Sequence, residues 1–239
     1  MGTTLAVARR EFRSFFNSPV AYIVLGVFLV VAGWLYFSTV FVAGQASLRA
    51  FFGIAPVLFV VFAPAVTMRL LAEERKSGTL ELLLSMPLRD WEVVGGKFLA
   101  ALGMVAVGLL WTLPYPLTVA SLTAEGARFD WGPVVMGYLG LLLMASSFLS
   151  LGLWASAISR NQIVGFIIGL LLCFAFYFID KFAMVLPESV GELLQYLSVD
   201  YHFANIARGV LDTRDLLFYL SLTAVGLALT TRTLGNVRQ

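Results

Sequence analysis

Six stretches of the chain contain no Asp, Glu, Lys or Arg, and they constrain its fold more than any other feature. They cover residues 20–48, 50–68, 98–124, 131–159, 161–179 and 216–231. A helix rises about 1.5 Å per residue and the hydrocarbon core of a bilayer is about 30 Å thick, so about 20 apolar residues can cross it. Five stretches are long enough, and the sixth needs flanking residues as well. We therefore expect six membrane crossings.

Composition points to the same class of protein. Hydrophobic residues make up 60% of the 239 residues and charged residues 13%, whereas about a quarter of the residues of a soluble domain are charged. The net charge of +2 is too small to indicate a nucleic-acid partner. Cys173 is the only cysteine, which excludes an intrachain disulfide. The sequence thus predicts an all-α, polytopic membrane protein whose surroundings are the lipid membrane.

The positive charges predict how the chain is oriented. We place the spans at 20–42, 50–70, 98–122, 132–157, 162–180 and 212–232, which puts eleven Lys and Arg residues on one side of the membrane and five on the other. Lys and Arg in short loops stay in the cytoplasm, so both termini are predicted to be cytoplasmic. A basic start before an apolar run is also typical of an export signal, but this run is too long and five more follow.

Residues 1–18 are predicted to form an amphipathic helix at the membrane interface. One face carries Leu5, Ala8, Phe12, Phe15 and Phe16, and the other carries Arg10, Arg13, Ser14 and Asn17, with Val7 as the exception. The residues expected to contact headgroups and acyl chains are Arg9, Arg10, Phe12, Arg13, Phe15 and Phe16. A simple lead-in to the first span is the alternative interpretation.

The connection at 71–97 combines many charges with a short apolar segment. Leu80, Leu82, Leu83, Leu84 and Met86 lie together, with Thr79 as a plausible helix N-cap and Pro87 as its stop. A two-turn helix that is apolar nearly all round cannot stay bare in water. It either packs under its own bundle or is held between the bundle and a second protein.

The same connection resembles a loop of ABC-2 type exporter permeases. Their pattern E-x-x-x-G-T-L-E-x-L-x-x-x-P is matched by Glu74, Gly78, Thr79, Leu80, Glu81, Leu82, Leu83 and Pro87, with Gly96 and Lys97 leading into the next span. The stretches 17–22 and 202–215 resemble the gliding-motility-associated (GldF-like) branch more narrowly. The resemblance implies a single ABC-2 transmembrane domain over 1–239 with the type V ABC exporter-like permease fold, in a bacterial inner membrane.

What the resemblance implies about partners is specific. We call residues 71–97 the coupling loop. Its short helix would seat in a groove of a separate ABC ATPase subunit. The implied coupling residues are Glu73, Glu74, Gly78, Thr79, Leu80, Glu81, Leu83, Leu84 and Pro87. Of these, Glu74 and Glu81 would make polar contacts, and Leu80, Leu83 and Leu84 would fill the groove. A second permease copy, identical or different, is expected as well, and the gliding-motility branch would add an auxiliary extracytoplasmic subunit.

Several kinds of chemistry are missing from the sequence. The nearest match to a phosphate-binding loop, 95–98, lacks the first glycine and the hydroxyl residue, so Gly95, Gly96 and Lys97 are interpreted as a flexible entry and an interfacial anchor. His202 has no ligand partners at metal-binding spacing and is expected to be structural or on the surface. No cofactor, metal or enzymatic activity is predicted. The apolar runs also lack the charges that an ion-driven carrier needs.

The sequence therefore predicts a permease powered by another chain, with an unidentified substrate. A mechanical or scaffold component of an envelope or gliding machine, which moves no substrate, is the alternative. Prolines at 56 and 64 in the second span and at 114 and 116 in the third are candidate kinks beside the substrate pathway. Small residues at 146–152, 165 and 169 would allow close helix packing. The segment 181–211 is expected to be partly embedded on the outer side.

Overall fold

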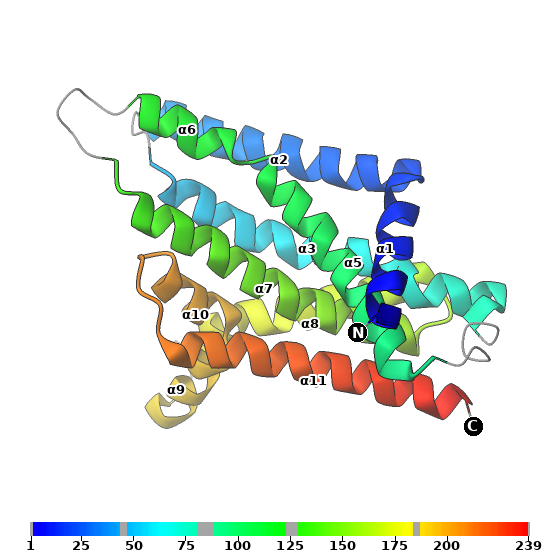
Figure 1. Ribbon diagram of the computed structural model, residues 1–239. Helices are drawn as coiled ribbons and strands as arrows, with labels where there is room; N and C mark the ends of the chain where they lie inside the picture. The colour runs from blue at the N-terminus through cyan, green and yellow to red at the C-terminus, as the bar shows by residue number, and fades with distance from the viewer. Residues whose placement is uncertain (1, 44–46, 81–87, 123–128, 184–186, 239) are drawn as a thin grey trace.

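The computed structural model describes residues 2–43, 47–80, 88–122, 129–183 and 187–238. All regular structure within these ranges is α-helical (Figure 1). The helices are α1 (Gly2–Phe16), α2 (Pro19–Ala43), α3 (Arg49–Ser77), α5 (Asp90–Leu110), α6 (Pro114–Ser121), α7 (Trp131–Ile158), α8 (Gln162–Ala183), α9 (Glu188–Tyr196), α10 (Val199–Ile206) and α11 (Thr213–Arg238).

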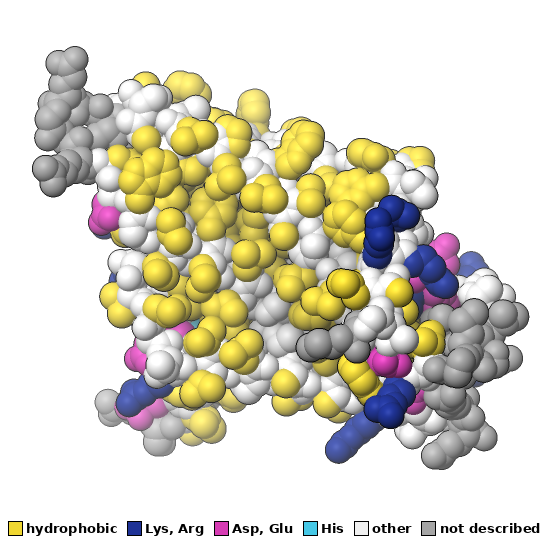
Figure 2. All heavy atoms as spheres, viewed as in Figure 1, with side chains coloured by type: hydrophobic (Ala, Val, Ile, Leu, Met, Phe, Trp, Pro, Cys, Tyr) yellow, Lys and Arg dark blue, Asp and Glu magenta, His cyan; other side chains and the backbone are white. Residues whose placement is uncertain are grey.

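Six segments are long and apolar enough to cross a membrane, which confirms the predicted all-α polytopic fold. They are Pro19–Val42, Arg49–Ser77, Asp90–Ser121, Trp131–Ile158, Gln162–Phe182 and Thr213–Asn236. The sixth has a mean hydropathy of 1.3, against 2.0 to 2.4 for the others. Figure 2 shows a broad belt of hydrophobic side chains between charged groups at the two ends of the bundle.

The two ends of the bundle carry different elements (Figure 1). We call the end with α1, the last turn of α3, the first turn of α5 and the end of α11 the proximal end. The end with α9 and α10 is the distal end. The helix α1 lies across the bundle, roughly perpendicular to α2, as expected of a helix in the plane of a membrane surface.

Helix α7 packs against α3, α8 and α11, and small residues allow the close approach. A Cβ built on Gly152 would lie 2.3 Å from the Thr67 hydroxyl of α3, and one on Gly226 of α11 would lie 2.4 Å from the Ser150 hydroxyl. Gly169 of α8 fits against Pro64 in the same way, with a distance of 3.2 Å. Close packing of this kind holds membrane helices together, because lipid offers no hydrophobic driving force between them. Of the small residues predicted to serve packing, Ser150, Gly152 and Gly169 do so.

The third span is broken about two thirds of the way along. Helix α5 ends at Leu110 and α6 begins at Pro114, where the missing amide of proline costs no helical hydrogen bond. The Thr112 hydroxyl donates to the Leu109 carbonyl at 2.7 Å, and the Tyr138 hydroxyl donates to the Thr112 carbonyl at 3.1 Å. The predicted kink at Pro114 is thus present as a break, and the Leu109 and Thr112 carbonyls have hydrogen-bond donors, as a membrane interior requires. By contrast, α3 continues as one helix through its two prolines.

At the distal end, His202 joins α10 to α11. It is 1% exposed, its Nδ1 lies 2.6 Å from Asp215 Oδ1, and its ring lies 4.1 Å from the Phe218 ring. Its Nε2 lies 2.9 Å from the Tyr196 carbonyl, so that nitrogen carries a proton. This histidine is structural rather than on the surface. No group of three potential metal ligands occurs among the described residues.

Candidate functional site

The proximal end brings together α1, the end of α3 and the start of α5. Helix α1 packs along α5 because glycines leave room for it. A Cβ on Gly96 would lie 2.6 Å from Val7, and one on Gly103 would lie 3.2 Å from the Phe12 ring. The prediction that Gly96 gives a flexible entry is therefore wrong, since it is a close-packing position. Val7, the exception on the predicted wheel, belongs to the face of α1 that contacts protein.

The aromatic face of α1 also packs inward. Phe15 is 3% exposed, and the Arg69 guanidinium of α3 lies 5.2 Å above its ring. Phe15 therefore contacts protein, not the acyl chains that the sequence pattern suggested. Phe12 and Phe16 are half-buried, with ring centroids 5.0 Å apart. The predicted basic residues Arg9, Arg10 and Arg13 are exposed and line one open depression on the outer side of α1.

Lys97 is the centre of the site. It is 1% exposed, and its Nζ lies 2.7 Å from Oε1 of Glu74 on α3 and 3.4 Å from Oε1 of Glu11 on α1. The two carboxylates are 18% and 13% exposed. One buried ammonium thus ties three helices together. Lys97 is not the interfacial anchor that its position predicted, and Glu74 is engaged inside the chain.

The end of α3 is also fixed to the end of α7. The Ser156 hydroxyl donates to the Met68 carbonyl at 2.9 Å and accepts from the amides of Leu71 and Ala72 at 3.1 and 3.0 Å. The Arg75 guanidinium donates to the Ala157 carbonyl at 2.9 Å. These contacts are invisible in the sequence, because each joins positions more than 80 residues apart. They leave the last two turns of α3 with little freedom to move alone.

Helix α3 ends at Ser77 and is capped by Gly78, whose φ of +72° is left-handed and suits glycine. The Ser77 hydroxyl donates to the Glu73 carbonyl at 3.0 Å, and the Thr79 hydroxyl donates to the Glu74 carbonyl at 3.4 Å. The described hydrogen bonds of Thr79 are thus made to α3, which precedes it. The amides that it was predicted to cap follow it in the sequence. The predicted coupling residues Glu81, Leu83, Leu84 and Pro87 lie outside the described residues.

The described part of the coupling loop has a buried side and an exposed side. Leu80 is 2% exposed and belongs to the core of the bundle, so its side chain is not free to fill a groove in a partner. Glu73, Lys76, Ser77 and Thr79 are exposed. Glu73 also borders a depression of about 460 Å³ between α1 and α3, which is lined by Arg10, Glu11, Ser14, Phe15, Ser18, Arg69, Leu70, Glu73 and Glu74. The exposed charges here are of both signs.

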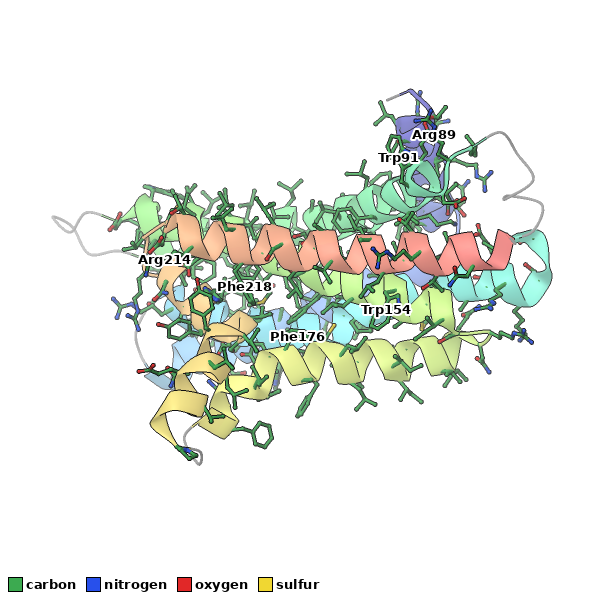
Figure 3. The ribbon with its side chains drawn as sticks, turned by 90° about the horizontal axis from the view of Figure 1, so that it is seen from below. Arg89, Trp91, Trp154, Phe176, Arg214 and Phe218 are labelled. Atoms are coloured by element: carbon green, nitrogen blue, oxygen red, sulfur yellow. The ribbon has the colours of Figure 1, made fainter. Side chains whose placement is uncertain are left out.

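Figure 3 shows that Arg89 and Trp91, at the start of α5, lie beside α1 at the same end of the bundle. The Glu92 carboxylate accepts from the Arg89 backbone amide at 3.0 Å and from the Thr3 hydroxyl of α1. An acidic residue in the first helical turn also suits the positive end of the helix dipole. The first turns of α1 and α5 are therefore joined, as the buried lysine joins their later turns.

Comparison with known proteins gives one result that covers most of the chain. A family model described as ABC-2 family transporter protein matches residues 39–232. The match begins near the end of α2 and includes the exposed end of α3, Lys97, the second to fifth spans and most of the sixth, and α1 lies outside it. No curated protein matches the chain.

Proposed function

Because the chain belongs to the ABC-2 family of transporter proteins, and is thus a membrane-spanning permease component, we propose that it turns ATP hydrolysis by a separate ATPase chain into translocation of a substrate. Its own role is mechanical rather than catalytic. The observation that carries the proposal is the buried contact of Lys97 with Glu74 and Glu11, which makes one unit of α1, α3 and α5.

A unit of this kind can transmit force. Helix α3 continues without interruption from its membrane span to Ser77, at the exposed proximal end. A push on that end would be shared by α1 and α5 through the buried charges, and by α7 through Ser156. Packed elements move as rigid bodies, whereas a loose polar loop would absorb the displacement. The described geometry therefore supports coupling at the proximal end.

The ATPase would dock on the exposed residues that end α3: Glu73, Lys76, Ser77 and Thr79. This differs from the assignment by resemblance, because Glu74 and Leu80 are occupied inside the chain. The proximal end would face the cytoplasm of a bacterial inner membrane, as the excess of Lys and Arg favours. A second permease copy would complete the transporter, since one chain supplies six spans. Membership of the gliding-motility branch would add an extracytoplasmic partner.

The test separates docking from internal rigidity. The tagged chain is purified from its own membranes, and both the ATPase that accompanies it and its ATP hydrolysis are measured. Glu73→Arg is expected to reduce the bound ATPase by about tenfold, because it reverses one charge in the interface. Arg214→Glu, at the distal end, is the matched charge reversal and should retain it. Equal recovery of ATPase with both variants would contradict the proposed docking surface.

Coupling is tested separately in proteoliposomes. Glu74→Gln should leave the ATPase bound but lower the number of substrate molecules moved per ATP, since it loosens α3 from α5. Substrate-dependent flux distinguishes transport from a purely mechanical role in an envelope machine. Hydrolysis without any flux, over a broad panel of lipids, peptides and polysaccharides, would count against transport.

A further inference from the structure

A pocket of about 670 Å³ opens at the distal end, far from the coupling site. It lies between the start of α3, the start of α7 and α10, and α6 contributes Val119. The volume is within the range of about 300–1,000 Å³ that is typical of ligand pockets. Neither the family membership nor the proposed coupling mechanism assigns a role to it.

The floor of the pocket is apolar and tightly built. Phe52 and Phe203 are 6% and 3% exposed, with ring centroids 6.5 Å apart. Glycines of α7 let both rings reach their places: a Cβ on Gly137 would lie 2.4 Å from the Phe52 ring, and one on Gly140 would lie 3.1 Å from the Phe203 ring. The floor is therefore a shaped hydrophobic surface and not a loose gap between helices.

Two arginines and two aspartates line the pocket, so their formal charges balance, but they differ in whether other described residues engage them. Asp130 caps α7 by accepting from the Gly132 amide at 2.9 Å, and Asp200 is paired with Lys181 at 3.0 Å. Both acidic residues are thus engaged. Arg49 and Arg208 are exposed, and neither guanidinium has a hydrogen-bond or ion-pair partner among the described residues. An anion is the group that such guanidinium groups bind best.

We propose that this pocket binds an anionic amphiphile. The hydrocarbon part lies on the floor of Phe52 and Phe203, and the phosphate or carboxylate lies against Arg49 and Arg208. The position at the end of the bundle is the level at which lipid headgroups meet water, so one ligand can reach both parts of the pocket. This inference does not depend on ATP coupling, and binding can be measured in the absence of any ATPase.

Gly53 provides the sharpest probe, because it lines the pocket and a Cβ on it would meet no heavy atom within 4 Å. Gly53→Leu is expected to narrow the pocket, because its Cβ enters open space. Gly26→Leu is the matched control, since that glycine also has nothing within 4 Å but lies on α2, away from the pocket. The charge probe is the double variant Arg49→Gln with Arg208→Gln, and its control is Arg214→Gln, which also lies at the distal end (Figure 3).

The full chain is reconstituted in nanodiscs that contain a phosphatidylglycerol with a diazirine on its acyl chain. After illumination, mass spectrometry locates the labelled peptides. Label is expected in 47–53, 129–134 and 200–208. Gly53→Leu and the double arginine variant should each lower it by about tenfold or more, while both controls keep it. Unlabelled phosphatidylglycerol should compete for the site and phosphatidylcholine should not.

The competitors also identify the source of the ligand. If soluble dodecyl phosphate competes, the pocket takes an anionic amphiphile from the water phase. If it does not compete, the ligand is a lipid of the bilayer. Competition by inorganic phosphate alone would overturn the amphiphile assignment. Equal labelling in Gly53→Leu and Gly26→Leu, or equal competition by phosphatidylcholine, would overturn the pocket. Because the Cβ of Gly53→Leu enters open space, this variant keeps the test decisive even if the double arginine variant folds poorly.

Discussion

Replacing Lys97 by methionine is expected to destabilise the protein strongly while keeping the volume of the side chain. The ammonium is 1% exposed and lies 2.7 Å from Glu74 and 3.4 Å from Glu11. Without it, two carboxylates would face each other in a largely buried place. Removing one partner of a buried pair costs about 3–5 kcal/mol. Because the carboxylates are 18% and 13% exposed and can recruit some water, we expect the lower end of that range.

A loss of about 3 kcal/mol lowers the ratio of folded to unfolded protein roughly a hundredfold, and the unfolding temperature by about 6–12 °C. Thermal unfolding in detergent, followed by tryptophan fluorescence, measures this shift. Lys76→Met is the matched control, since Lys76 is exposed on the same end of α3 and its loss should cost about 0.5 kcal/mol or less.

A double-mutant cycle tests the stated cause. With Glu74→Leu added, the double variant should lose about 1–3 kcal/mol less than the sum of the single variants, because one orphaned carboxylate is gone. Unfolding temperatures within about 2 °C for Lys97→Met and Lys76→Met would refute the reasoning, on the scale of about 2–4 °C per kcal/mol. So would strict additivity in the cycle.

Three further substitutions probe the packing. Gly96→Leu should detach α1 from α5, since a Cβ there would lie 2.6 Å from Val7, and limited proteolysis of α1 should become faster. Gly226→Leu should lower stability by about 1–3 kcal/mol, because its Cβ would lie 2.4 Å from the Ser150 hydroxyl, and thermal unfolding measures the loss. Ser156→Ala should cost about 1–3 kcal/mol and raise hydrogen exchange at the end of α3, whose backbone it bonds.

These three variants share simple controls. Gly26→Leu adds the same side chain where a Cβ meets nothing within 4 Å, and should be neutral or stabilising by up to about 1 kcal/mol. Ser221→Ala removes an exposed hydroxyl that bonds only within its own helix, to the Phe218 carbonyl. If Gly96→Leu and Gly26→Leu give equal proteolysis, close approach is not what holds α1. Equal exchange in the two serine variants would likewise exclude the role of Ser156.

The six spans are predictable from the chain alone because a membrane imposes a condition on composition. A single segment satisfies its own backbone in lipid only as a helix, since the alternative is a closed barrel of many strands, and its lipid-facing side chains must be apolar. The break in the third span is predictable for an equally local reason, since Pro114 has no amide to donate. The transverse α1 follows from its alternation of basic and aromatic residues.

The partners of the charged residues are not predictable in this way. Lys97 precedes an apolar run, a position typical of an interfacial anchor, and its pairing with Glu74 depends on how α3 meets α5. For the same reason Gly96 looks like a loop residue until α1 is packed on it. Leu80 belongs to an apolar cluster whose burial could come from the chain itself or from a partner, and only the arrangement of helices decides. The roles proposed for residues 81–87 stay predictions.

The break between Leu110 and Pro114 has a mechanical consequence. Helix α5 is joined to α1 and α3, whereas α6 is held by α2, where the Tyr115 ring stacks on Tyr36 at 5.3 Å. A continuous helix moves as one rigid body, so tilting one end displaces the other. A break allows the two parts of the span to move separately. If the proposed coupling holds, α5, with 21 residues, would tilt as the long arm while α6, with 8 residues, keeps its place. The movement of the span would then end at Leu110, and only the eight residues of α6 beyond the break would stay fixed.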